Sequence, residues 1–211
     1  MKDIPFFTTE YGVASLTLSQ IPYRATAYIQ VLTAQEGMRS ALIAECSGFC
    51  RAAGADHIFW SAEDADLPAH SAVVEMRGEA ISDPSRTESL FPVTEATVSA
   101  WRQIHNERMA SVDHARYLTT ADEKEILSSG AYFIHRDGTL LGIGWLTDDT
   151  IRAIASVYPG AGECVLHTLM TLAPGQMLRL EVASTNTKAL ALYERIGFFA
   201  VKNIKIWFAV Q

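Results

Sequence analysis

The sequence has few of the features that mark several protein classes. It holds only 3 cysteines in 211 residues, an odd number in a chain that shows no export signal, which argues against a disulfide framework. Nowhere do roughly 18 apolar residues follow one another, so no membrane-spanning helix is predicted. The first residues lack the basic stretch and apolar run of a secretory signal. We therefore expect a cytoplasmic protein with reduced cysteines and no membrane partner.

Basic residues are also scarce. The chain has 17 Lys and Arg against 24 Asp and Glu, a formal net charge of -7, and its basic residues are scattered along the sequence. A nucleic-acid partner is therefore not predicted. Cys46 and Cys50 would share a helical face, but no His or Cys at a suitable spacing completes a metal site, so we predict two buried thiols and no metal. With 49% hydrophobic residues and 7 prolines, the chain should fold into a packed globule.

The polar stretch 82–87 is the best candidate for a domain boundary, which divides the chain into an N-terminal α/β region, 1–82, and a larger domain, 83–211. Turn residues and apolar periodicity predict the elements of the first region: a strand over 25–32, a helix over 37–53, and strands over 57–60 and 71–76, the last two separated by an acidic turn at 63–68.

The larger domain alternates strands and helices. Its predicted elements are a strand over 88–93, a helix opening at Thr94, a short helix capped by Thr120 with Glu123, a hairpin of 131–135 and 139–145 around Asp137-Gly138, a strand over 150–157, a helix within 160–172, a strand over 178–182, a helix over 187–195 and a strand over 198–210. This order indicates a mixed α/β sheet.

One segment carries a detailed pattern. Residues 180–198 read LEVASTNTKALALYERIGF, in which Asn186 suits a helix entry and Gly197 permits a left-handed helix exit. Between them, Ala189 stands three residues after the asparagine and Tyr193 lies on the apolar face of the predicted helix. The segment thus combines a strand, a capped helix and a returning strand.

This run resembles the corresponding segment of the GNAT superfamily of N-acetyltransferases. The resemblance implies a mixed, mostly antiparallel central sheet flanked by helices, with acetyl-CoA as co-substrate and a small-molecule or peptide amine as acceptor. It also implies that Tyr193 is a catalytic acid that returns a proton to the CoA thiolate. A homodimer is left open by the sequence. Residues 37–80 weakly echo the element order of the second domain, so the N-terminal region is either a degenerate half-copy of the same fold or a coincidence.

The resemblance extends backward to the strand over 150–157 and the loop after it. Here the helix N-terminus would bind the CoA diphosphate through exposed amides, and the Val157 N–H would polarise the thioester carbonyl. The residues that the resemblance assigns to the cofactor are Val157, Gly160, Ala161, Gly162, Glu163, Cys164, Val165, Asn186, Ala189 and Tyr193.

The loop departs from the family pattern. It is one residue short, Glu163 adds a negative charge, and no Lys or Arg lies between Arg152 and Arg179. Lys188 and Arg195 of the next helix are the cations that could help to bind the diphosphate. This departure motivates the alternative that the chain is a non-catalytic GNAT-like acyl-CoA-binding or interaction module. A dinucleotide-binding loop is disfavoured, because Gly160-Ala161-Gly162 has no third glycine at the required spacing.

The reaction expected from the resemblance is direct attack of the amine on the thioester, in preference to a covalent route through Cys164. No general base is evident among the nearby titratable residues, which are Asp148, Asp149, His167 and Glu181. The acceptor is expected to meet the segment 101–121, where the polar candidates are Asn106, His114, Arg116 and Tyr117. The sequence does not indicate which amine is acetylated.

Overall fold

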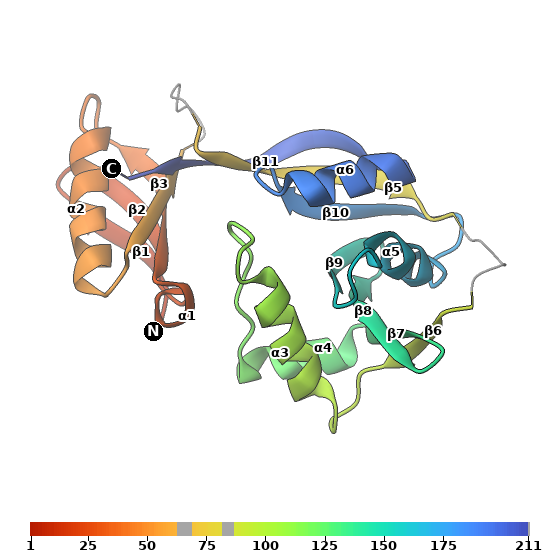
Figure 1. Ribbon diagram of the computed structural model, residues 1–211. Coiled ribbons are helices and arrows are strands. Elements are labelled where there is room, and N and C mark those ends of the chain that lie inside the picture. The colour runs from red at the N-terminus through yellow and green to blue at the C-terminus, as the bar shows by residue number, and fades with distance from the viewer. Residues whose placement is uncertain (63–68, 82–86, 211) are drawn as a thin grey trace. The chain divides into compact units, whose positions relative to one another are not determined.

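A computed structural model describes residues 1–62, 69–81 and 87–210 (Figure 1). The chain forms two compact units, Met1–Ala72 with Ile204–Gln211, and Val73–Asn203. This division differs from the boundary predicted after residue 82. Most of strand β5 (Ser71–Glu79) belongs to the second unit, because it pairs with β10 (Met177–Ala183) over seven residue pairs. The acidic turn 63–68 and most of the polar stretch 82–87 lie outside the described residues.

The first unit is a five-stranded sheet with strand order β1-β2-β3-β4-β11. Its elements are β1 (Ile4–Thr9), β2 (Gly12–Thr17), α1 (Ile21–Arg24), β3 (Thr26–Ala34), α2 (Arg39–Ala52), β4 (His57–Ser61) and the end of β11 (Phe199–Ala209). Only β3 and β4 run parallel; the other neighbours are antiparallel.

Helix α2 covers one face of this sheet. Its buried side chains Leu42, Cys46 and Cys50 pack with Ile29 and Trp60 of the strands. Burial raises the pKa of both Cys46 and Cys50 to about 11, so both thiols stay protonated at neutral pH. The prediction that these two cysteines are buried is confirmed.

The second unit contains a larger sheet, with strand order β11-β5-β10-β9-β8-β7-β6, in which β9 and β10 form the parallel pair. Its remaining elements are β6 (Ser89–Pro92), α3 (Val98–Met109), the 3₁₀ turn Thr120–Asp122, α4 (Glu123–Ser128), β7 (Ala131–Arg136), β8 (Thr139–Thr147), β9 (Thr150–Ser156), α5 (Gly162–Met170) and α6 (Thr187–Ile196). The predicted mixed, mostly antiparallel sheet with flanking helices is confirmed.

Two apolar clusters cover opposite faces of this second sheet. On one face, α5 and α6 supply Leu166, Leu169 and Tyr193, which pack against β5 and β10. On the other, α3 and α4 supply Trp101 and Ile126, which pack against β7, β8 and β9. Since both faces are covered, the sheet is the middle layer of three.

Local signals placed several elements correctly. Asp137 and Gly138 have φ values of 49° and 77°, the backbone that an Asp-Gly hairpin turn requires. Asn186 accepts a hydrogen bond from the Ala189 N–H at 3.2 Å, and Gly197 ends α6 with φ 101°. The capping pair of the short helix lies one residue before the predicted pair of Thr120 and Glu123. It consists of Thr119 and Asp122, and the Asp122 carboxylate accepts hydrogen bonds from both the N–H and the hydroxyl of Thr119.

Candidate functional site

The two parallel strands of the second unit diverge shortly after they meet. Only two residue pairs join them, Arg179 with Thr150 and Leu180 with Ile151. On its other edge, β9 pairs with β8, and there Trp145 faces Ala153 while Leu146 faces Ile151, so Arg152 is an extra residue in β9. A bulge of this kind bends its strand away from the regular ladder. Beyond Arg152, β9 therefore separates from β10. The two strands form a V whose arms are β9 and β10 and whose closed end is the paired segment.

The first unit contains the corresponding parallel pair, but there the strands stay together. Strands β3 and β4 pair from Thr26 with His57 through Gln30 with Ser61, which is the whole length of β4. No backbone edge is released between them. The open parallel pair, and with it the candidate site, is thus a property of the second unit.

Helix α5 begins next to the open end of β9. Its first turn consists of Gly162, Glu163 and Cys164. The N–H groups of a first helical turn point out of the helix N-terminus, because no helical carbonyl precedes them by four residues. Val165 is different, because its N–H donates to the Ala161 carbonyl at 2.9 Å and its side chain is fully buried. Val165 is thus a core residue whose N–H is used within the helix, and its contact with a cofactor stays a prediction.

The Val157 amide is also engaged. Its N–H donates to the Leu141 carbonyl at 2.8 Å, which leaves it unable to polarise a carbonyl in the V as expected. Backbone groups alternate sides along a strand, so the N–H of Ser156, one residue earlier, points away from β8 and toward the open edge.

The fold brings arginines to this loop from other elements. Arg195 of α6 donates two hydrogen bonds to Glu163, at 3.1 and 3.2 Å. Arg136, at the end of β7, donates to the Cys164 sulfur at 3.2 Å, and Arg108 of α3 donates to the Val157 carbonyl at 3.3 Å. The negative charge of Glu163 is therefore paired with Arg195, and Arg136 brings a second guanidinium to the first turn of α5. Only Arg195 had been considered from the sequence.

Glu88 anchors the Arg136 guanidinium. Its side chain is 2% exposed and accepts from Arg136 and, at 2.9 Å, from the Cys164 thiol. Burial alone would raise the pKa of Glu88, but the hydrogen bonds from Cys164 and Arg136 outweigh it and lower this pKa to about 2. Glu88 thus stays ionised and holds the arginine beside the start of α5. Sequence reasoning missed Glu88, which no local spacing connects to α5.

Tyr193 lies on the inner face of α6. Only 7% of its surface is exposed, and it packs with Leu166 in the core while its ring centroid lies 6.1 Å from that of Phe198. Burial raises the pKa of Tyr193 to about 12, so the hydroxyl remains protonated at neutral pH. Asn186 and Ala189 are joined to each other by the helix cap described above. These two residues therefore shape the start of α6.

The last turn of α3 and the segment after it together reach both arms of the V. Arg108 meets the end of β9, and Asp113 accepts a hydrogen bond from the Thr185 hydroxyl, just beyond β10, at 2.7 Å. Two of the residues predicted to line the acceptor pocket form contacts with other parts of the chain. Asn106 holds the Leu118 backbone through two hydrogen bonds of 2.8 Å, and Arg116 forms an ion pair with Asp122.

The fold of the chain is similar to that of known structures. A functionally unknown conserved protein from Staphylococcus epidermidis has a TM-score of 0.58 and 12% identity, over 96% of this chain and 91% of its own. A GCN5-related N-acetyltransferase from Sphaerobacter thermophilus has a TM-score of 0.57 and 11% identity, over 94% and 76% of the two chains. A putative acetyltransferase from Pyrococcus horikoshii has a TM-score of 0.55 and 12% identity, over 95% and 69%. The chain has the GNAT fold.

The similarity lies in the structure and not in the sequence. No family model matches the chain, and no curated protein matches it either. Identities of 11–12% establish the GNAT fold alone. Whether this GNAT-fold chain is an enzyme therefore depends on its own residues.

Two of the general-base candidates lie apart from the open end. Asp148 and Asp149 form the turn that precedes β9, at the closed end of the V, and Asp149 pairs with Arg179 at 3.3 Å. Glu181 is exposed on β10, opposite Glu75 of β5. Neither turn aspartate is therefore placed to take a proton where the strands are open.

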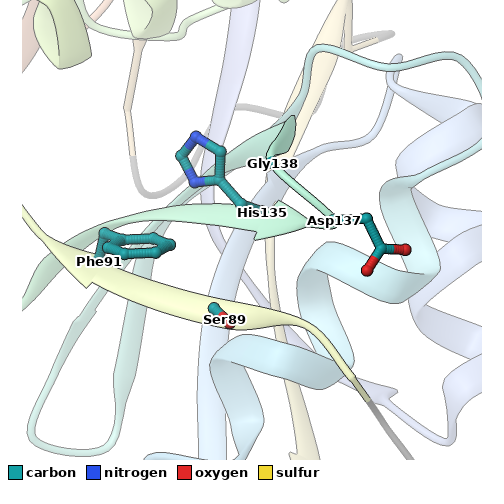
Figure 2. A pocket seen from close by; sticks show the side chains of 5 residues that line it. All are labelled: Ser89, Phe91, His135, Asp137 and Gly138. Atoms are coloured by element: carbon teal, nitrogen blue, oxygen red, sulfur yellow. The ribbon is translucent and has the colours of Figure 1, made fainter.

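A separate pocket of about 290 Å³ lies between the edge strand β6, the end of β7 and the turn that follows β7. Ser89, Phe91, His135, Asp137 and Gly138 line it, and Figure 2 shows that the His135 ring and the Asp137 carboxylate lie apart from each other. None of these residues belongs to β9, β10 or α5. The pocket is therefore a feature of β6 and β7 and not of the V.

Membrane-spanning helices and metal-binding clusters are both absent from residues 1–62, 69–81 and 87–210. Within these ranges no helix combines the length and the apolar character needed to cross a membrane. Within the same ranges, no three His, Cys, Asp or Glu side chains are grouped so that they could share a metal ion.

Proposed function

We propose that this chain is an acyl-CoA-dependent N-acetyltransferase that transfers the acetyl group of acetyl-CoA to an amine by direct attack. The observation that carries the proposal is the divergence of β9 and β10 at the Arg152 bulge. This divergence leaves the facing backbone edges of β9 and β10 unpaired with each other, inside a sheet whose two faces are both covered by helices. An extended, amide-bearing pantetheine arm suits such edges, as an added strand suits the edge of a sheet.

The start of α5 supports a site for the cofactor's diphosphate. The N–H groups of a first helical turn and the helix dipole both favour an anion. Arg136 adds a guanidinium 3.2 Å from the Cys164 sulfur of this turn. Because Glu163 is paired with Arg195, its charge is partly neutralised where it would otherwise repel phosphate. Gly160 has φ 79°, and a β-carbon added there would meet no atom within 4 Å, so this glycine leaves the approach open.

The proposed reaction balances as an acyl transfer. The neutral amine attacks the thioester carbonyl carbon, a C–N bond forms, and the C–S bond breaks with its electron pair on sulfur. Tyr193 donates its hydroxyl proton to the thiolate, and the proton lost by the amine nitrogen returns to the Tyr193 phenolate through water, so that no net proton is released. The Ser156 N–H takes the role of carbonyl donor that Val157 cannot fill.

The rival function is an acyl-CoA-binding module without catalysis. Two observations favour it: the Val157 amide is used within the sheet, and Tyr193 is buried in the core with a pKa raised to about 12. A donor with so high a pKa transfers its proton readily only if the buried thiolate is itself made more basic by desolvation. Binding and turnover must therefore be measured separately.

Calorimetric titration with acetyl-CoA tests the cofactor site. The Gly162→Arg substitution places a long side chain over the first turn of α5, where even a β-carbon would lie 3.2 Å from Leu192. It should weaken binding by at least about tenfold. Gly48→Arg is the matched control, because Gly48 is exposed on α2 with nothing within 4 Å, and it should bind as the wild type does. No heat of binding with any acyl-CoA would refute the proposal.

Release of CoA thiol over a panel of amines then separates enzyme from module. Tyr193→Phe keeps the ring in the core and removes only the hydroxyl, so it should lower kcat by about 10²-fold or more while acetyl-CoA binding is retained. An unchanged kcat would remove Tyr193 from the mechanism. Binding without turnover on any amine would favour the non-catalytic module.

A further inference from the structure

Two oppositely charged side chains stand at the end of α3, five residues apart. Arg108 lies in the last turn of the helix and Asp113 in the segment that follows. Both side chains are exposed. The backbone between them is ordered by hydrogen bonds from Val112 N–H to the Met109 carbonyl, at 3.0 Å, and from Ala115 N–H to the Val112 carbonyl, at 3.3 Å.

Each of the two residues is fixed to a different arm of the V. The Arg108 guanidinium donates to the carbonyl of Val157, the residue that directly follows β9. The Asp113 carboxylate accepts from the hydroxyl of Thr185, two residues beyond β10. The end of α3 and the residues after it thus place the Arg108 cation at one side of the open end and the Asp113 anion at the other.

Neither charge is neutralised by an ion pair within the described parts of the chain. Arg108 has only a backbone carbonyl as its partner, and Asp113 has only a hydroxyl. Other arginines of this unit behave differently, since Arg102, Arg116, Arg136 and Arg195 are each paired with a carboxylate. Arg108 and Asp113 therefore keep hydrogen-bonding capacity for a ligand that carries both charges.

We propose that the acceptor is a zwitterionic amine, that is, an amino acid, whose carboxylate binds Arg108 and whose ammonium binds Asp113. This inference rests on the acetyltransferase function proposed above. A guanidinium matches a carboxylate with two parallel hydrogen bonds, and a carboxylate accepts from an ammonium. The ammonium loses one proton to water before attack, so the products are the N-acetyl amino acid, CoA thiol and a proton.

The test compares amino acids with the amines obtained by removing their carboxyl group. Suitable pairs are histidine with histamine, tyrosine with tyramine, arginine with agmatine and ornithine with putrescine. In the wild type, kcat/KM for the preferred amino acid should exceed that for its partner amine by at least about tenfold, as expected when an oriented guanidinium is left without its carboxylate.

Two variants assign the preference to its residues. Arg108→Gln should bring the two members of each pair to similar kcat/KM values, and Asp113→Asn should raise KM for both members. Both variants should retain the acetyl-CoA affinity of the wild type in calorimetry. Arg179→Gln is the matched control: this arginine pairs with Asp149 at the closed end of the V, and its loss should leave the preference unchanged.

The outcomes distinguish this inference from the function on which it rests. A wild-type protein that binds acetyl-CoA and acetylates amines, but does not prefer the amino acid of any pair over its decarboxylated partner, overturns the zwitterionic acceptor. An Arg108→Gln variant that keeps the wild-type preference overturns it as well. Binding of acetyl-CoA without turnover on any amine would favour the non-catalytic module. Absence of acetyl-CoA binding would instead overturn the acetyltransferase proposal itself.

Discussion

The buried carboxylate of Glu88 should make the second unit sensitive to acid. Its pKa is lowered from 4.5 to about 2 because the hydrogen bonds from Cys164 and Arg136 outweigh the effect of burial. A group whose pKa is lower in the folded state contributes stability above its unfolded pKa. This contribution should therefore be complete above about pH 4.5 and should be lost as the pH falls to about 2.

The size of the effect follows from the two pKa values. They differ by about 2.5, and at about 1.36 kcal/mol for each pKa unit this corresponds to about 3 kcal/mol. The guanidinium of Arg136 is 47% exposed, so solvent screening reduces the contribution. We expect about 2 kcal/mol, which is a substantial part of the stability of a typical domain.

Urea unfolding of the wild type and of Glu88→Gln, measured from pH 7 to pH 2, tests this. The variant should be less stable by about 2 kcal/mol at pH 7, and the difference should vanish near pH 2. Glu194→Gln is the control, because Glu194 is exposed on α6 and its curve should run parallel to that of the wild type. A difference between wild type and Glu88→Gln that is as large at pH 2 as at pH 7 would refute the reasoning.

Two further predictions concern stability. Gly142→Ala would set a β-carbon 2.4 Å from a carbonyl of β9 and should cost about 2 to 4 kcal/mol, whereas Gly48→Ala, with nothing within 4 Å on helix α2, should stabilise the chain by about 0.5 to 1 kcal/mol. Asn106→Ala should cost about 2 to 3 kcal/mol in urea unfolding, because it leaves both backbone groups of Leu118 without their partner. Gln103→Ala, which removes only an exposed contact, should change stability by less than about 0.5 kcal/mol.

The elements that the sequence predicted well are those with strong local punctuation. The Asp137-Gly138 turn and the helix between Asn186 and Gly197 are specified by residues whose backbone preferences allow few alternatives. Strands β1 and β2 were missed, because Pro5 interrupts the first run and Gly12 the start of the second, so neither showed the alternation expected of a strand. They become strands by pairing with each other and with β3.

The site was predicted only in part, because its electrostatics depend on contacts between distant residues. The helix predicted within 160–172 is α5, and Tyr193 lies on the apolar face of α6 as its spacing predicted. Local spacing could not show that Arg136, 28 residues before Cys164 in the chain, would reach α5, or that the Val157 amide would be used by Leu141. The bulge at Arg152 is equally invisible in one strand alone, since it is defined by the register against β8.

Strand β11 has a consequence for biosynthesis. It begins in the second unit, and its closing residues complete the sheet of the first, where Phe208 and Ala209 pair with Trp60 and Phe59. The N-terminal unit therefore cannot finish folding until the ribosome has made the whole of the second unit and β11 after it. Until then the nascent unit exposes the edge of β4, and an unpaired strand edge favours aggregation.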